Sequence, residues 1–223
     1  MIKAVFLDAA GTLIGVKGSV GEIYRQVAQD WGVDLDAAVL QQQFRQACQA
    51  VPPVDFSRGD WEAAERQWWY GVVWQTVGGE QFPDFAGYFA VLYDRFAQGE
   101  AWEPYPEVVA VLTVLQARGL PLVVVSNFDQ RLIQVLRELG LSSYFQAVVY
   151  SSLVGHAKPD PAIFTYALAR VQLRPAQVLH VGDSRRADLL GAQQAGLRAL
   201  WLDRTGAEGD AIGDLMQLLA HLD

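Results

Sequence analysis

Runs of consecutive apolar residues recur at five places along the chain, and they are rich in β-branched and aromatic side chains. Each run is four to six residues long, which is typical of a strand buried on both faces. The pattern therefore predicts a sheet of five buried strands. The runs are 2–7, 121–125, 146–150, 178–181 and 198–202.

Apolar residues at helical spacing occupy the intervals between the later runs. Gly119, Gly140 and Gly196 follow three of these segments, and glycine is favoured where a helix ends in a left-handed turn. Strands that alternate with helices in this way indicate an α/β fold, with a parallel sheet covered by helices on both faces. The expected helices are 106–118, 129–139, 161–171 and 185–195.

Residues 18 to about 100 follow a different pattern, because they show helical spacing and no convincing strand. We expect a separate all-helical unit over 16–100, inserted into an α/β core formed by 1–15 and 101–223. The hinges between the two are expected near Gly15–Gly18 and Gly99–Pro104. The helices expected in this unit are 18–32, 34–50, 58–77 and 82–98.

The third of these helices is unusually rich in tryptophan. Trp61, Glu65, Trp68 and Val72 fall on one face at helical spacing, and we interpret the indole rings as the core of a small helical bundle. The alternative interpretation is that one or two of the rings line a substrate entrance.

The composition of the 223 residues narrows the class of protein. Hydrophobic residues make up 52% and charged residues 19%, which excludes a disordered chain. The net charge of −8 repels phosphate backbones and anionic lipid, so we expect neither nucleic acid nor membrane as a partner. The single cysteine, Cys48, excludes an internal disulfide and a structural zinc site. We expect a soluble, cytoplasmic protein that is a monomer or a weak homodimer.

Polar residues follow three of the predicted strands, at the edge where ligands bind in an open parallel sheet. Asp8 follows the first strand, Ser126 and Asn127 follow the second, and Asp183 follows the fourth. Lys158 precedes the helix at 161–171, in a chain that has only three lysines. Two carboxylates, a lysine and a hydroxyl suit a divalent cation together with a bound phosphoryl group.

These segments resemble the four motifs of the haloacid dehalogenase-like (HAD) hydrolase superfamily, and the resemblance covers the whole chain. It implies a Rossmann-like α/β core, and the helical insert is similar to the cap of the subfamily I branch. The motifs are Asp8-Ala9-Ala10-Gly11-Thr12, Val125-Ser126-Asn127, Lys158-Pro159-Asp160-Pro161 and Gly182-Asp183-Ser184, which continues to Asp188 and Gly191.

The resemblance assigns a role to each matching position. Asp8 corresponds to the nucleophile that forms an aspartyl-phosphate intermediate, and Mg²⁺ is expected between Asp8, Asp183 and the backbone carbonyl of Ala10. Lys158 would neutralise the nucleophile and the phosphate of a small phosphorylated molecule.

The remaining assignments concern the polar neighbours of these groups. Ser126 and the Asn127 amide would hold phosphate oxygens, and Thr12 would hydrogen-bond the loop or the nucleophile, or serve as a plain turn residue. Asp188 is expected to support Lys158 or a metal-bound water. Ser184 is interpreted as a helix N-cap, and neither His156 nor His180 receives a catalytic role.

Ala10 departs from the pattern of the family's phosphatases, which have at this position a second Asp that protonates the leaving group. General acid–base assistance is typically worth ~10² to 10⁴ in rate, so the loss is large. Three interpretations remain: a Mg²⁺-dependent phosphohydrolase without this acid, a carbon–halogen or carbon–phosphorus hydrolase, and a binding protein with little turnover. Glu22, Tyr24 and Arg25 are the first candidates for a replacement proton donor.

Specific residues argue against each of the two carbon-bond chemistries. Haloacid dehalogenases usually have Tyr at the position of Ala10. Phosphonoacetaldehyde hydrolases have Ala there, but they form a Schiff base with a cap lysine. Residues 18–157 contain no lysine, and Lys17, in the hinge region, would need to reach inward. The phosphohydrolase is therefore the favoured interpretation.

Overall fold

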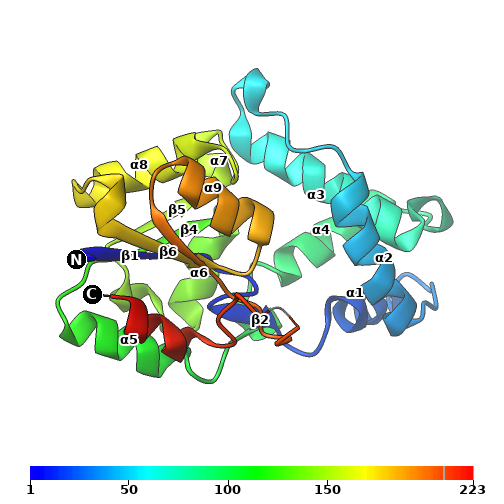
Figure 1. Ribbon diagram of the computed structural model, residues 1–223. Coiled ribbons are helices and arrows are strands. Elements are labelled where there is room, and N and C mark those ends of the chain that lie inside the picture. The colour runs from blue at the N-terminus through cyan, green and yellow to red at the C-terminus, as the bar shows by residue number, and fades with distance from the viewer. Residues whose placement is uncertain (208, 223) are drawn as a thin grey trace.

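A parallel sheet forms the centre of the computed structural model, which describes residues 1–207 and 209–222 (Figure 1). In the described residues the sheet has five strands in the order β5-β4-β1-β6-β7, and every neighbouring pair is parallel. The α/β fold class expected from the sequence is confirmed. The strands are β1 Ala4–Leu7, β4 Leu122–Ser126, β5 Ala147–Tyr150, β6 Val178–Gly182 and β7 Arg198–Trp201.

Helices cover both faces of this sheet, which explains why its strands are apolar throughout. Ala4 and Phe6 of β1 pack on one face with residues of α8, whereas Val5 and Leu7 pack on the other with residues of α5 and α6. The helices of this unit are α5 Val108–Ala117, α6 Arg131–Glu138, α7 Ser151–Val154, α8 Pro161–Val171 and α9 Gly191–Gln194.

The helix expected over 185–195 begins as a wider π-helix, Arg185–Leu190, and becomes regular only in α9. Its N-cap is Ser184, whose hydroxyl accepts a hydrogen bond from the Ala187 backbone at 3.1 Å. The side chain of Asp188 returns to accept from the Ser184 backbone at 3.0 Å. π-Helical turns are frequent at functional sites, and this one directs Asp188 into the interior.

Four helices lie beyond the end of the sheet at which β1 terminates (Figure 1). They are close to the ranges expected from the sequence, and residues 17–101 contain no strand. The helices are α1 Val20–Gln29, α2 Ala37–Ala50, α3 Trp61–Val77 and α4 Phe85–Arg95. Short 3₁₀ turns lie at Phe56–Arg58, Gly79–Gln81, Gly99–Ala101, Ser142–Tyr144, Pro175–Gln177 and Leu215–His221.

The two connections to these helices run side by side as a two-stranded antiparallel ribbon. It consists of β2 Ile14–Val16 and β3 Trp102–Pro104, with Ile14 opposite Pro104 and Val16 opposite Trp102. Both predicted hinges overlap this ribbon, and the boundary that we placed between residues 15 and 16 falls inside β2. The division into two domains stays a prediction.

Two tryptophans of α3 lie at the surface, contrary to our interpretation of the indole rings as a bundle core, whereas Trp69 packs against the core. Trp61 is 38% exposed and Trp74 is 39% exposed, whereas Glu65 and Val72 of the same helix are buried. An indole ring is amphipathic, and its N–H can be satisfied at a surface, as when Trp61 donates to the Phe56 carbonyl at 3.1 Å. No helix of the described chain is long and apolar enough to cross a bilayer.

Side-chain caps fix the starts of the four added helices. Ser19, Asp36, Asp60 and Asp84 each accept a hydrogen bond from a backbone N–H three residues further on, at 2.9–3.1 Å. Such a cap satisfies one of the N–H groups that a helix start leaves free. The exact starting residues of these helices therefore follow from single polar side chains.

Replacement of the α2 cap, Asp36→Ala, is expected to lower the free energy of unfolding by about 1 kcal/mol. The measurement is urea unfolding of the native chain and the variant, followed by circular dichroism. Asp34→Ala is the matched control, because Asp34 is an exposed aspartate two residues away that does not cap the helix. Equal losses in the two variants would contradict a capping role for Asp36.

Candidate active site

A buried lysine connects two segments at the carboxyl edge of the sheet. The Lys158 ammonium donates to Asp8 Oδ1 at 2.7 Å and to Asp188 Oδ1 at 2.5 Å, and Lys158 is only 5% exposed. Burial opposes its charge, but the two carboxylates outweigh that effect and raise the pKa of Lys158 above its ordinary value. The lysine is therefore held as a cation in the interior.

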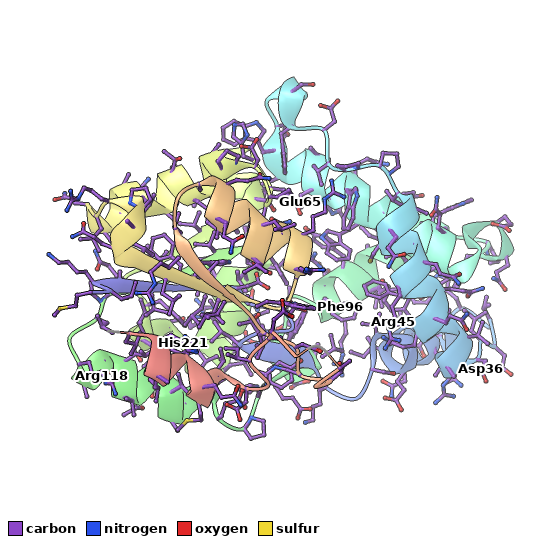
Figure 2. The ribbon with its side chains drawn as sticks, viewed as in Figure 1. Asp36, Arg45, Glu65, Phe96, Arg118 and His221 are labelled. Carbon is purple, nitrogen blue, oxygen red and sulfur yellow. The ribbon has the colours of Figure 1, made fainter. Side chains whose placement is uncertain are left out.

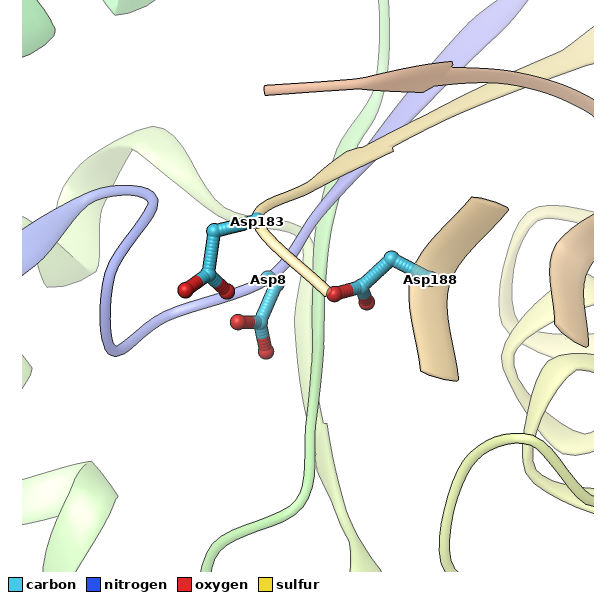
Figure 3. Close-up of side chains that lie close together, drawn as sticks. All are labelled: Asp8, Asp183 and Asp188. Atoms are coloured by element: carbon cyan, nitrogen blue, oxygen red, sulfur yellow. The ribbon is translucent and has the colours of Figure 1, made fainter. Parts of the chain in front are cut away.

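Three carboxylates surround this single ammonium. Ligand oxygens of Asp8, Asp183 and Asp188 all lie within 4.8 Å of one another. Figure 3 shows Asp8 beside Asp183 and Asp188, which come from the loop after β6 and from the π-helix. Burial raises the pKa of Asp8, although Lys158 opposes the shift. Asp183 is the exposed member of the three, and its partial desolvation together with the Asp8 carboxylate raises its pKa to about 7. The site thus carries more negative charge than Lys158 can balance.

The Asp188 carboxylate interacts with two neighbouring side chains. Its carboxylate accepts from Lys158 and lies 2.9 Å from His180 Nε2. Although burial disfavours its charge, Lys158 and His180 hold the pKa of Asp188 below its ordinary value. The His180 ring also packs edge-on against Phe164, which agrees with the structural role expected for this histidine. His156 lies outside this cluster, paired with Asp160 at the surface.

The site has the features that a hard divalent cation requires. Asp8 and Asp183 offer carboxylate oxygens with uncompensated charge, and Mg²⁺ prefers such oxygen ligands. In the described residues no backbone N–H or side chain donates to the Ala10 carbonyl. A Cβ atom at Gly11, whose φ is +87°, would lie 2.2 Å from Asp183 Oδ2, so the loop approaches this carboxylate closely. The donor set therefore fits the metal.

The loop after β1 is held by hydrogen bonds to two segments of the C-terminal part of the chain. The Asp8 backbone donates to the Val181 carbonyl at 3.0 Å, which fixes the carboxylate beside β6. From beyond β7, Arg204 donates to the Gly11 carbonyl at 3.2 Å and to the Thr12 carbonyl at 2.7 Å. Arg204 also pairs with Glu107 at 2.7 Å. Sequence reasoning missed Arg204, although it follows a predicted strand whose end lies at this same edge.

Asn127 positions the backbone of Lys158. Its carboxamide oxygen accepts from the Lys158 backbone N–H at 2.6 Å, and its nitrogen donates to the Lys158 carbonyl at 2.9 Å. The side chain is therefore engaged, and its backbone N–H is the group that remains for a phosphate oxygen. The buried Ser126 side chain lies beside Asp8 and opposes the rise in the pKa of that carboxyl.

Thr12 lies in a turn, which agrees with the second of the two interpretations and not with a hydrogen bond to the loop or the nucleophile. Its side chain is fully buried, and its hydroxyl has no hydrogen-bond partner among the described residues, neither in the loop nor on Asp8. Ser184 does act as the N-cap that the sequence suggested. The structure therefore brings together Asp8, Ser126, Lys158 and Asp183, with Ala10 and Asn127 beside them and Thr12 beneath the loop.

A cavity of about 680 Å³ opens beside Ala10, Asn127 and Asp183, between the core and the added helices. Its walls are mostly apolar and aromatic, and they include two arginines, Arg45 and Arg131. Of the three candidate proton donors, Tyr24 lines this cavity, and Glu22 and Arg25 do not. The aromatic lining comprises Tyr24, Phe44, Trp69, Phe89, Tyr93, Phe96, Trp102, Tyr105 and Phe128.

A buried hydrogen-bond chain links the added helices to the core. The hydroxyl of Ser151, in α7, lies 2.9 Å from Glu65 Oε2 and 2.8 Å from the Phe128 carbonyl oxygen. A hydroxyl has one proton, so it can donate to only one of these two oxygens. The chain is complete when Glu65 is protonated and donates to Ser151, which then donates to Phe128. Consistently, burial raises the pKa of Glu65 to about 8.

Comparison with known proteins identifies a family model that covers most of the chain. Residues 2–196 match the model of haloacid dehalogenase-like hydrolases. Haloacid dehalogenase-like hydrolase domain-containing protein 3 of Mus musculus is 36% identical over 96% of this chain and 90% of its own length. The glyceraldehyde 3-phosphate phosphatase of Methanothermobacter thermautotrophicus is 29% identical over 95% of this chain and 91% of its own length.

Solved structures agree on the fold. The putative HAD-hydrolase YfnB from Bacillus subtilis, bound to magnesium, superposes with a TM-score of 0.80. The two sequences are 20% identical, and the match covers 99% of this chain and 98% of that one. This likeness extends over both the sheet and the added helices.

The protonated Glu65 predicts a specific pH dependence of stability. Its pKa rises from 4.5 to about 8 on folding, so the stabilisation is complete below about pH 4.5 and is lost as the pH rises through about 8. Glu65→Gln keeps a donor toward Ser151 without the titration. Relative to this variant, the native chain is expected to lose about 3 kcal/mol between about pH 5.5 and 9.

The measurement is urea unfolding of both chains across that pH range. Glu80→Gln, at an exposed carboxylate of the same helical region, is the control and should track the native chain. A constant difference between the native chain and Glu65→Gln at every pH would show that Glu65 is ionised in the folded state.

Proposed function

The chain belongs to the haloacid dehalogenase-like hydrolase family, and we propose that it is a Mg²⁺-dependent phosphohydrolase acting on a small phosphorylated molecule. The observation that carries the proposal is the buried pairing of Asp8 with Lys158, with Asp183 beside it at the mouth of a cavity. A carboxylate held by an ammonium is suited to attack phosphorus, because the cation reduces its repulsion by the phosphate.

The proposed reaction has two steps. In the first, an Asp8 oxygen forms a bond to phosphorus while the bond to the leaving group breaks, and the leaving group departs with the electron pair. Lys158 fixes Asp8 Oδ1 at 2.7 Å, which leaves Oδ2 for the attack. In the second step, water attacks the aspartyl phosphate, and phosphate and the free carboxylate are released.

The side chains around Asp8 supply positioning and charge. Lys158 neutralises negative charge on the transferred group, and Ser126 and the backbone N–H of Asn127 are placed to hold its oxygens. Asp8, Asp183 and the Ala10 carbonyl would hold Mg²⁺, which supplies further charge neutralisation when bound. Phosphatases among the relatives support the proposal of a phosphohydrolase. One is the phosphoserine phosphatase of Thermus thermophilus, which is 37% identical over 49% of this chain.

The added helices are proposed to act as a cap over this site. In this division the cap comprises residues 16–100, and the core comprises 1–15 and 101–223. Opening and closing would bend the ribbon of β2 and β3, through which both connections pass. The Glu65–Ser151–Phe128 hydrogen-bond chain would favour the closed arrangement.

Asp183→Asn is expected to weaken Mg²⁺ binding and to abolish metal-dependent turnover of an aryl phosphate. Partial desolvation and the nearby Asp8 carboxylate raise the pKa of Asp183, so removal of its charge should leave stability unchanged or increased. Isothermal calorimetry measures the affinity, and thermal unfolding verifies the fold. Asp210→Asn, at an exposed aspartate, is the control. Native-like Mg²⁺ affinity in Asp183→Asn would remove Asp183 from the metal site.

The missing acid at Ala10 predicts a strong dependence of rate on the leaving group. An alkoxide departs poorly without a proton, whereas a phenolate or a carboxylate departs readily. The native chain should therefore hydrolyse aryl and acyl phosphates much faster than alkyl phosphates, and it should not act on haloacids or phosphonates. Ala10→Asp should accelerate alkyl phosphate hydrolysis about 10-fold or more.

The measurement is the steady-state rate of both chains on a matched series of leaving groups, with haloacids and phosphonates included. Ala9→Ser is the control, because it adds a polar group one residue away, at a buried position that does not line the cavity. Efficient alkyl phosphate hydrolysis by the native chain would mean that another residue donates the proton. Turnover of a haloacid or a phosphonate alone would overturn the phosphohydrolase.

A further inference from the structure

The cavity beside the carboxylates is lined by two kinds of side chain. Asn127 and Asp183 of the core contribute polar groups, and most of the aromatic rings come from the added helices and the ribbon. Its volume of about 680 Å³ lies within the range of small-molecule sites and far exceeds what a phosphate group fills. The remaining space therefore suits the leaving group of the substrate.

The aromatic rings that line the cavity come from separate segments. Phe44 of α2 and Trp69 of α3 are nearly parallel, with their centroids 6.5 Å apart. Phe96, at the end of α4, meets Trp102 of β3 edge-on at 5.9 Å. Phe44, Trp69 and Phe96 are only half-buried, so part of each ring remains available for contact. An aromatic molecule gains area and favourable ring geometry from such walls.

The two arginines of the cavity differ in whether a carboxylate of the protein already pairs with them. Arg131 is neutralised by Asp129, whose carboxylate it contacts at 2.7 Å, and its guanidinium lies over the Tyr93 ring at 3.5 Å. Arg45 is exposed, and no residue in the described part of the chain forms an ion pair or hydrogen bond with it. In a chain of net charge −8, this leaves one unpaired cation at the cavity.

The position of Arg45 follows from the helix that carries it. Gln41, Phe44 and Arg45 occupy one face of α2, at the spacing that brings residues together on a helix, and all three line the cavity. Figure 2 shows Arg45 and Phe96 in the same region, between α2 and the core. A guanidinium in this place can pair with a carboxylate through two parallel hydrogen bonds.

From these contacts we propose that the substrate is an aryl phosphate whose ring carries a carboxylate. The ring lies among Phe44, Trp69, Phe96 and Trp102, and its carboxylate pairs with Arg45. The phosphate lies at Asp8 and Lys158, so this inference rests on the phosphohydrolase proposed above. The methyl group of Ala10 is compatible with it, because a phenolate leaving group needs little help from an acid.

The first test compares kcat/KM for 4-carboxyphenyl phosphate and phenyl phosphate. The native chain should prefer the carboxylated ester about 10-fold or more, and Arg45→Met should remove most of this preference through KM. Arg118→Met is the matched control, because Arg118 is an exposed arginine on the far side of the core and should leave the ratio unchanged (Figure 2). Equal kcat/KM for the two esters in the native chain overturns the proposal.

A binding measurement separates this proposal from the phosphohydrolase itself. The probe is 4-(phosphonomethyl)benzoate, and quenching of tryptophan fluorescence reports its binding. Binding that weakens about 10-fold in Arg45→Met supports the recognition of an aromatic carboxylate, even if no ester is hydrolysed and the proposed function fails. Hydrolysis of alkyl phosphates together with no binding of this probe leaves the phosphohydrolase standing and overturns the aromatic carboxylate.

Discussion

The buried ammonium of Lys158 is the constraint on which the rest of the site depends. A lysine without a partner is costly in an interior, so two carboxylates must reach it, and they come from the end of β1 and from the π-helix. Asn127 fixes the lysine backbone, and the wide helical turn lets Asp188 point inward. Asp183 then remains as an uncompensated carboxylate, which makes the site a receptor for positive charge.

The core and the added helices contribute different chemistry. The clustered carboxylates belong to the strand ends and loops of the core, whereas most of the aromatic lining of the neighbouring cavity comes from the helices. In the proposed function, a change of an aromatic ring or arginine in the helices would therefore alter the preferred leaving group without disturbing Asp8. This separation agrees with the general location of ligand sites at the carboxyl edge of a parallel sheet.

The strands could be predicted because each apolar run is as long as a buried strand. The site residues among them could be predicted because polar side chains directly follow three of these runs. Other features depended on contacts that sequence spacing does not contain. The ribbon of β2 and β3 has only three residues in each strand, too few for a pattern. Periodicity grouped Glu65 with the tryptophans of α3, but it did not indicate that the carboxyl group would be the buried member. Likewise, nothing near Asn127 in the sequence points to Lys158.

The pairing of β2 with β3 also has a consequence for the engineering of the chain. Because Val16 lies opposite Trp102, the inserted helices leave and rejoin the core at neighbouring points. A turn of about two residues is enough to close an antiparallel pair of this kind. The strands of the core sheet can thus keep their order and connections when the helices are absent, shortened or exchanged for another module. The ribbon is therefore a point at which the whole helical unit, together with the cavity lining that it contributes, can be exchanged.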